Sequence, residues 1–450
     1  MPLFNIVPVT VSGETSELED WTLTVDKGPI ADDPDLVEYV WAANRPPDGL
    51  YDKIAVHRVV RADGEATEGV VFILPGTWSS GEQLVHTRKD GKQYGVPSEN
   101  HSITHYLANR GFDVYTLDYR THFVPHTVAD HEFMLNWGWD AWMSDIKAAV
   151  NLTKTVSGVS RIYIAGESFG GGAAMNYASL YWEEDLEGII LLDAYWCKSA
   201  GKRGGETDTF DLTEAIENMT ASGEYSWPSA GGPNNPHWAY ALADPGDPSP
   251  YPGFDNITHF LMHQLYLANS SNPYDYPWSQ PEAMFAILAS FDPYWPARLG
   301  LESLAYMDWT ECPYLYDFDD HYIEIDVPTI AFLSERFGYY RWGDFVNGLA
   351  NPDFTGILLE AHGHLDVYAG TYVRERVNEP TYQWLIAHRL LGDLNSDGIV
   401  DIFDVVTVSI AFGSKPGDTN WNPQADVAEP YNEIDIFDVV TVTMNLGKTA

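Results

Sequence analysis

Apolar residues along much of this chain gather in short runs that alternate with stretches of helical spacing. The runs end at Gly, Pro or Asp and predict buried strands at 69–74, 112–118, 161–165, 186–192, 327–333 and 355–359. Helices are predicted at 101–110, 142–156, 171–182 and 379–391, and two further strands at 21–25 and 54–60. Strands that alternate with helices predict an α/β fold, with a mainly parallel sheet covered by helices on both faces.

This rhythm stops between residues 199 and 322, where Pro, Gly, Trp and Tyr are abundant. Helix-like pieces at 257–268 and 281–290 lie within the segment, and the sheet pattern resumes after it. An insertion of this length between strands predicts a cap on the α/β domain, which we place at 1–391. Its aromatic residues are expected to form the core of the cap more often than to contact a substrate.

The composition changes again after residue 391, where the octapeptide DIFDVVTV occurs twice, at 401–408 and at 435–442. An identical repeat of this length indicates an internal duplication. We therefore predict a separate small module at 392–450.

The overall charge restricts the partners of the protein. There are 66 acidic and 24 basic residues, a formal net charge of −42, which excludes binding to nucleic acid or to anionic membranes. No apolar run reaches the roughly 18–20 residues of a membrane-spanning helix. The first residues, MPLFNIVPVT, lack the features of a signal peptide, so we expect a cytoplasmic protein or a leader that is already absent. Cys197 and Cys312 either clamp the base of the insertion as a disulfide or stay free thiols.

The strongest chemical signal is Gly166-Glu167-Ser168-Phe169-Gly170, between a predicted strand and a predicted helix. In this pattern a serine sits on a tight, strained turn that lifts its hydroxyl above the sheet, at the positive end of a helix. Small residues on either side prevent clashes in the turn. Ser168 is therefore the predicted nucleophile.

A nucleophilic serine needs a base and a group that orients the base. His364 is the predicted base, because Gly363 frees the loop after strand 355–359 to turn, and His362 is the competitor. Glu335 is the predicted acid, because it is the first acidic residue after strand 327–333. Asp344 and Asp193 remain the alternatives.

The oxyanion formed during attack needs two backbone N–H donors. Phe169 follows the nucleophile directly and is one predicted donor. Thr77, on the loop after strand 69–74, is the other, with Trp78 as its alternative.

Residues 69–391 resemble the α/β-hydrolase fold family, with the esterases and lipases as nearest relatives. The resemblance rests on the Gly-x-Ser-x-Gly turn and on Gly363-His364-Leu365-Asp366, which is similar to the catalytic-histidine segment of some lipases. It implies hydrolysis of a carboxylic ester through an acyl-enzyme. Peptidases, thioesterases and polyester depolymerases share the fold, so hydrolysis of another acyl bond is the alternative. A non-catalytic binding protein on a hydrolase scaffold is the alternative from another functional class.

The repeated module contains a predicted calcium loop. An EF-hand-type loop places oxygen ligands at its first, third, fifth, seventh, ninth and twelfth positions, with Gly at the sixth. The first copy supplies Asp393, Asn395, Asp397, Ile399 through its carbonyl, Asp401 and Asp404, with Gly398 at the sixth place. The second copy departs from this pattern. It keeps Asp435 and Asp438 and has Asn432 at the glycine position. When the loop is counted backward from Asp438, the segment that begins at Asp426 is one residue too long.

Two calcium loops, each followed by a helix, at the end of a catalytic chain resemble a type I dockerin. That resemblance implies Ca2+ as a structural ion, a cohesin-type protein partner and an extracellular or cell-surface location. Because dockerins accompany polysaccharide-degrading enzymes, it also favours acetyl or feruloyl esters of plant material as substrates. The predicted protein is a secreted serine esterase with a calcium-dependent docking module.

Overall fold

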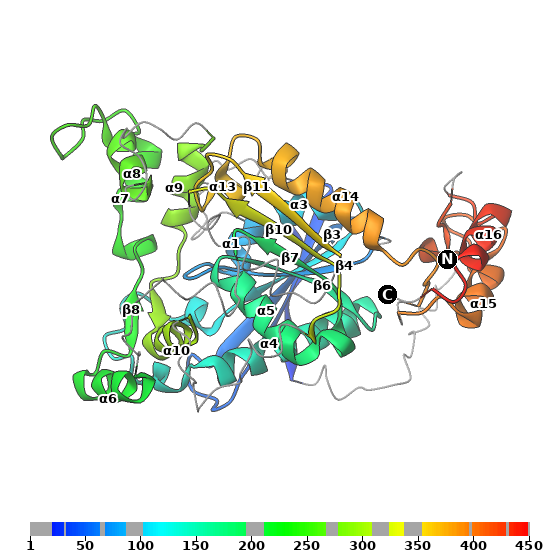
Figure 1. Cartoon of the computed structure of the whole chain (residues 1–450), viewed down its shortest axis with the longest axis horizontal. Coiled ribbons are helices and arrows are strands. Elements are labelled where there is room, and N and C mark those ends of the chain that lie inside the picture. Colours follow the sequence, from blue (N-terminus) through cyan, green and yellow to red (C-terminus); the bar gives the residue numbers. More distant parts are fainter. Residues whose placement is uncertain are drawn as a thin grey trace, which may run out of the picture.

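A central β-sheet with helices on both faces organises most of the chain (Figure 1). The computed structural model describes residues 20–30, 33–63, 68–86, 102–194, 211–266, 278–307, 324–336, 353–395, 398–428 and 432–448. Cys197, Cys312, Asp344 and Asp397 lie outside these residues.

Nine strands form the sheet in the order β1-β2-β3-β5-β4-β6-β7-β10-β11. The first three pair antiparallel along one edge, and the strands from β5 to β11 run parallel. Their bounds are β1 Trp21–Pro29, β2 Leu36–Asn44, β3 Lys53–Arg61, β4 Val70–Leu74, β5 Asp113–Asp118, β6 Ile162–Glu167, β7 Leu186–Leu192, β10 Thr329–Ser334 and β11 Phe354–Leu359.

The helices form one layer on each face of the sheet and bury two separate apolar clusters. On one face pack α4 (Trp139–Ser157) and α5 (Phe169–Asp185). On the other face lie α1 (Gly81–His86), α3 (Ile103–Ala108), α13 (Asp366–Ala369) and α14 (Glu379–His388). Continuous apolar strands are what a parallel sheet covered on both faces requires, since each side chain meets a helix.

Short 3-10 and π-helical turns complete this part of the chain. They are η1 (Arg120–Phe123), η2 (Glu132–Asn136) and the π-helical turn η6 (Arg374–Asn378). The predicted alternation of strands and helices is confirmed, and β2 is an additional strand that the sequence pattern did not predict.

Between β7 and β10, the described part of the insertion is mostly helical. It contains α6 (Leu212–Ser222), β8 (Ser226–Pro228), η3 (Gly232–Asn234), α7 (His237–Ala243), α8 (Ile257–Tyr266), α9 (Pro281–Ala289), β9 (Tyr294–Pro296) and α10 (Ala297–Met307). Figure 1 shows these elements along one side of the sheet domain. Trp295 and Phe285 are buried in the two apolar clusters that flank the sheet, so these two aromatic side chains are core residues.

The last helices form a small unit on the side opposite the insertion (Figure 1). Helices α15 (Ile402–Ala411) and α16 (Ile436–Met444), with the 3-10 turn η7 (Pro423–Ala425), enclose an apolar cluster of their own. Both helices begin with the same capping box, in which an aspartate caps the helix and a second aspartate three residues later reaches back. No helix among the residues described here is long and apolar enough to cross a membrane.

Candidate active site

Ser168 stands at the turn between β6 and α5 in a strained conformation, with φ of 51° and ψ of −120°. The turn is tight because its backbone segments touch. A Cβ atom added to Gly166 would lie 2.2 Å from the carbonyl oxygen of Gly170, and one added to Gly170 would lie 2.1 Å from that of Leu74. Glycine is therefore required at both places, and the hydroxyl of Ser168 is carried at the positive end of α5.

His364 contacts Ser168 directly. Its Nε2 lies 2.8 Å from Ser168 Oγ, and its Nδ1 lies 2.6 Å from Asp193 Oδ2. Burial acts to lower the pKa of His364, but the hydrogen bond and the negative charge of Asp193 outweigh it and raise the pKa. Asp193 thereby fixes the ring so that Nε2 can accept the proton of the serine.

Asp193 follows the end of β7 and is fully buried. Its Oδ1 accepts a hydrogen bond from Ser334 N at 2.7 Å, and its Oδ2 accepts one from Ser334 Oγ at 2.6 Å. Its φ of 47° turns the chain away from the strand. Because Ser334 ends the neighbouring strand β10, two strand ends together hold the carboxylate against His364.

The prediction that Glu335 orients His364 is wrong. Glu335 Oε2 accepts a hydrogen bond from Ala361 N at 2.6 Å, so this side chain braces the loop after β11. The carboxylate at Nδ1 belongs to Asp193, one of the alternatives. The reason is the strand order: β7 lies directly beside β6, and the backbone N–H of Ser168 donates to Leu192 O, next to Asp193.

The competing histidine occupies another position. His362 Nδ1 lies 2.7 Å from the carbonyl oxygen of Glu360, and its ring stacks on Trp278 at 5.8 Å. Two other histidines, His57 and His105, have structural contacts. His57 bridges Glu38 and Asp118, and His105 contacts the backbone of helix α1.

Asp366 supports the histidine loop, a role that the sequence analysis did not recognise. Its Oδ2 accepts a hydrogen bond from Gly363 N at 2.7 Å, and its Oδ1 accepts one from Ser279 Oγ at 2.5 Å. Ser279 lies in the insertion, two residues before helix α9. Its bond to Asp366 connects the insertion to the loop that carries His364. The position of Asp366 in the sequence, two residues after the predicted base, could have indicated this role.

Phe169 and Thr77 lie on the turns after β6 and β4, the two turns that are predicted to supply the oxyanion donors. Phe169 is the first residue of α5, and its ring is wedged between Trp139 and Trp295, with centroids at 5.1 and 4.8 Å. Thr77 follows the end of β4, beside Trp78, whose φ is 63°. The assignment of their N–H groups as oxyanion donors remains a prediction.

The two loops of the C-terminal unit repeat the same backbone contacts. Gly398 N donates to Asp393 Oδ2 at 2.8 Å in the first loop, and Asn432 N donates to Asp426 Oδ2 at 2.6 Å in the second. Asn432 has φ of 72°, the left-handed conformation that the glycine position of a calcium loop requires. The second loop accommodates its extra residue while it keeps this contact.

The end of each loop is closed in the same way. Asp404 accepts backbone hydrogen bonds from Leu394 and Asp401, and Asp438 accepts the equivalent bonds from Val427 and Asp435. Of the remaining predicted ligands, Asn395 and Ile399 are exposed at the first loop.

One oxygen of the second loop fits a cation. Asp426 Oδ1 is buried and has no hydrogen-bond partner in the described part of the chain. Burial and the charges of Asp438 and Asp435 raise the pKa of Asp426. Among the described residues, however, no three acidic, histidine or cysteine side chains are arranged to hold a metal ion. Calcium binding therefore stays a prediction.

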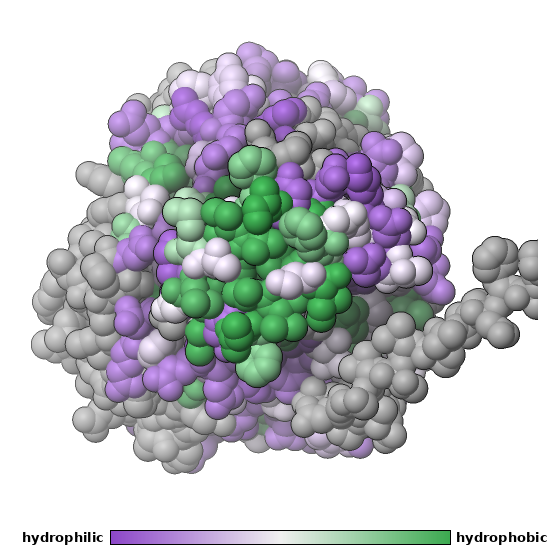
Figure 2. Space-filling model, turned by 90° about the vertical axis from the view of Figure 1, so that its right-hand side faces the viewer, coloured by the Kyte–Doolittle hydropathy of each residue, from purple (hydrophilic) through white to green (hydrophobic). Residues whose placement is uncertain are grey.

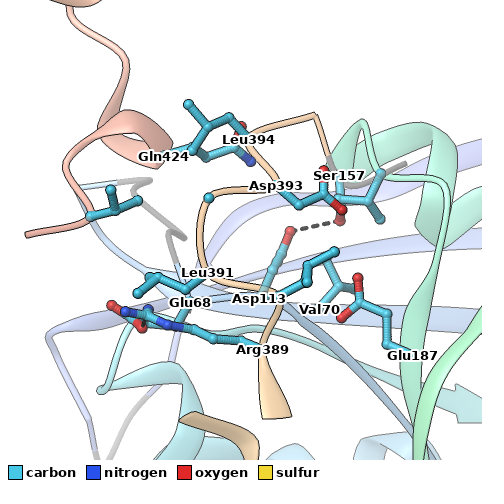
Figure 3. Close-up of a pocket in the computed structure, with 15 residues that line it drawn as sticks. Glu68, Val70, Asp113, Ser157, Glu187, Arg389, Leu391, Asp393, Leu394 and Gln424 are labelled. Carbon is cyan, nitrogen blue, oxygen red and sulfur yellow. Dashed lines mark hydrogen bonds and ion pairs between the residues drawn. The ribbon is translucent and has the colours of Figure 1, made fainter. Parts of the chain in front are cut away.

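A cavity of about 100 Å³ lies where the chain passes from α14 into the C-terminal unit (Figure 3). Glu187 and Asp393 contribute to its wall, as do Asp113 and Ser157, which are joined by a hydrogen bond of 2.8 Å. Its strand residues come from the amino ends of β4, β5 and β7, whereas Ser168 and Asp193 lie at carboxyl ends. This cavity is therefore separate from the Ser168 site.

Comparison with known proteins agrees with this geometry. Residues 98–200 match the family described as serine aminopeptidase S33. A lipase candidate from Sulfolobus solfataricus, whose crystal structure is known, is 46% identical in sequence to this chain. The two structures match with a TM-score of 0.70, and the match covers 82% of this chain and 100% of that one. The chain belongs to the α/β-hydrolase fold family. No curated protein matches it.

Two monoacylglycerol lipases resemble this α/β-hydrolase more distantly. The enzyme of Paleococcus ferrophilus is 13% identical with a TM-score of 0.44, and the match covers 72% of this chain and 97% of that one. A soluble variant of the Saccharomyces cerevisiae enzyme is 14% identical with the same TM-score, covering 75% and 92%. Likenesses this distant carry no argument about the substrate.

Proposed function

We propose that this α/β-hydrolase cleaves carboxylic esters through an acyl-enzyme on Ser168. The observation that supports the proposal is the chain of hydrogen bonds from Ser168 Oγ through the His364 ring to Asp193. This arrangement makes a hydroxyl nucleophilic at neutral pH. The likeness to the Sulfolobus protein, which is described as a lipase candidate, favours an ester over an amide.

In the proposed mechanism, Ser168 Oγ attacks the ester carbonyl while His364 Nε2 accepts its proton. Asp193 keeps the other proton on Nδ1 and stabilises the imidazolium. The N–H groups of Phe169 and Thr77 bind the oxyanion. His364 then protonates the leaving alcohol, which breaks the ester bond and leaves the acyl group on Ser168. Water repeats the sequence, with His364 as base, and releases the acid.

The test compares p-nitrophenyl esters from acetate to palmitate with wild type, Ser168→Ala, His364→Ala and His362→Ala. We expect the first two variants to lose activity by about 10⁴-fold or more. His362→Ala, two residues away, is the matched control and keeps most of the activity. A serine-reactive phosphonate labels wild type and not Ser168→Ala. If the wild-type protein were inactive and the phosphonate did not label it, the non-catalytic alternative would be favoured. If it hydrolysed amides faster than esters, the substrate class would be amides.

We further propose that the C-terminal unit is a calcium-dependent docking module for a cohesin-type protein outside the cell. The two copies present the same apolar side chains: Ile402 and Phe403 in one, Ile436 and Phe437 in the other, each 56–65% exposed. Figure 2 shows a broad hydrophobic area on the side of the molecule where these helices lie. An exposed apolar area of this kind is typical of an interaction surface.

Calcium binding is tested by titrating the metal-free full-length protein calorimetrically, with Asp404→Ala and Asp438→Ala as separate variants. We expect chelation to lower the melting temperature of the module and to leave ester turnover largely intact. No heat of binding with wild type would refute the calcium proposal. A calcium-loaded protein that binds no cohesin domain would refute the choice of partner only.

A further inference from the structure

A second carboxylate lies beside the catalytic histidine. Glu167 is the last residue of β6, immediately before Ser168, and is only 2% exposed. Its Oε1 lies 3.5 Å from Nε2 of His364, the nitrogen that also contacts Ser168 Oγ. The imidazole ring is therefore placed between two acidic groups, Asp193 at Nδ1 and Glu167 near Nε2.

The oxygen of Glu167 that faces His364 is in an unusual environment. Among the residues that the structure describes, Glu167 Oε1 is buried and has no hydrogen-bond partner. A buried polar atom without a hydrogen bond destabilises a protein, and such groups are retained mainly where they have a function.

The same carboxyl group holds the loop that carries the predicted oxyanion donor. The backbone N–H of Gly76 donates a hydrogen bond to it, and a Cβ atom at Gly76 would lie 2.1 Å from Glu167 Oε2. Tyr119 fixes the preceding residue, because its hydroxyl donates to Pro75 O at 3.1 Å. Glu167 thus joins the nucleophile strand, the oxyanion loop and the base.

The charge of Glu167 depends on the groups around it. Burial has the largest effect and raises its pKa. The charge of His364, the Tyr368 hydroxyl and the Gly76 N–H lower the pKa, and the charge of Asp193 raises it. Together these effects bring the pKa of Glu167 to about 6. Tyr119 is the other titratable group that faces it. Above pH 6 the carboxyl is therefore predominantly ionised, and below pH 6 it is predominantly neutral.

We propose that Glu167 is a positioning residue of the hydrolase, whose carboxylate stabilises the His364 imidazolium while it holds the oxyanion loop through Gly76. The proton taken from Ser168 stays on His364 and passes to the leaving alcohol, and Glu167 forms no covalent bond. A fixed negative charge near Nε2 favours the transition state, in which the ring becomes cationic, over the ground state, in which it is neutral. This inference rests on the proposed serine-esterase function.

Glu167→Gln separates charge from shape, because the amide keeps the size of the side chain and an oxygen to accept the Gly76 N–H. We expect kcat/KM for p-nitrophenyl butyrate at pH 8 to fall about tenfold, mainly through kcat, a fraction of the 10²–10⁴-fold typical of general base catalysis. The acidic limb of the kcat/KM profile moves to lower pH, since removing a negative neighbour lowers the pKa of His364. A merely structural role would not move that limb.

The control is Glu187→Gln. Glu187 is a partly buried glutamate whose pKa is also raised, to about 7, but it lies near the opposite end of β7, beside Asp393 and Arg161. We expect this variant to keep the wild-type pH profile. A Glu167→Gln enzyme with wild-type kcat or an unmoved acidic limb would refute the proposal. If a serine-reactive phosphonate did not label the wild-type protein, the ester-hydrolase function itself would be refuted instead.

Discussion

Replacing Asp193 by Asn tests which acid orients His364. The substitution keeps the shape of the side chain and changes its hydrogen bonding. Asp193 Oδ1 accepts from Ser334 N, which the amide oxygen can continue to do. The amide nitrogen then takes the place of Oδ2, where it donates to His364 Nδ1 instead of accepting from it.

The size of the effect follows from the tautomer. An imidazole that accepts at Nδ1 carries its proton on Nε2, so it points an N–H at Ser168 Oγ and cannot remove the serine proton. The packing around the site stays as it is, because the two side chains have the same volume. We expect kcat to fall about 10⁴-fold, or about 5.5 kcal/mol of transition-state stabilisation.

The assay is the pH dependence of p-nitrophenyl butyrate hydrolysis, with phosphonate labelling rates as an independent measure of Ser168 reactivity. Glu335→Gln is the matched control, because the Glu335 side chain accepts a hydrogen bond from the backbone of Ala361, and the variant should stay within about threefold of wild type. If Asp193→Asn kept a tenth of the activity, or if Glu335→Gln lost as much as Asp193→Asn, the assignment of the acid would be wrong.

Two further predictions concern stability. Gly170→Ala should destabilise the fold by about 3 kcal/mol in urea and abolish turnover, because the added Cβ would lie 2.1 Å from a backbone oxygen; Gly246→Ala, where nothing lies within 4 Å, should be nearly neutral. His57 donates to Glu38 and Asp118 inside the sheet, and these carboxylates, against the opposing effect of burial, raise the pKa of His57 to about 10. The raised pKa gives stability that is complete below pH 6.5 and is lost as the pH rises through 10, so the melting temperature should fall between pH 7 and 10. His57→Ala should cost about 3–5 kcal/mol at pH 7 and remove that pH dependence; a variant as stable as wild type would contradict the ion-pair argument.

Local patterns were sufficient to predict most of the sheet and the nucleophile. Buried parallel strands are apolar on both faces and stand out in the sequence, and the turn around Ser168 has steric requirements that only glycine meets at Gly166 and Gly170. Strand β2 was not predicted because it lies in the antiparallel part of the sheet, where partly buried positions and polar residues such as Glu38 interrupt the apolar run.

The acid could not be predicted because its choice depends on which strands are neighbours. The sequence shows an acidic residue after β7 and another after β10, and both strands end at the same edge of the sheet. Only the pairing of β6 with β7 places Asp193 beside Ser168, and only the side-chain direction at the end of β10 turns Glu335 away. The role of Glu167 was hidden for the same reason, since Gly76 and His364 meet it through tertiary contacts.

The position of the C-terminal unit sets the orientation of the enzyme on any support. The unit is joined at the end of the sheet where β4, β5 and β7 begin, and Ser168 stands where β6 ends. An enzyme held through this unit would turn its catalytic face outward, away from the structure that carries it. An insoluble or bulky ester could then approach without competing for space with the anchor, and immobilisation through this end should leave turnover of large substrates unhindered.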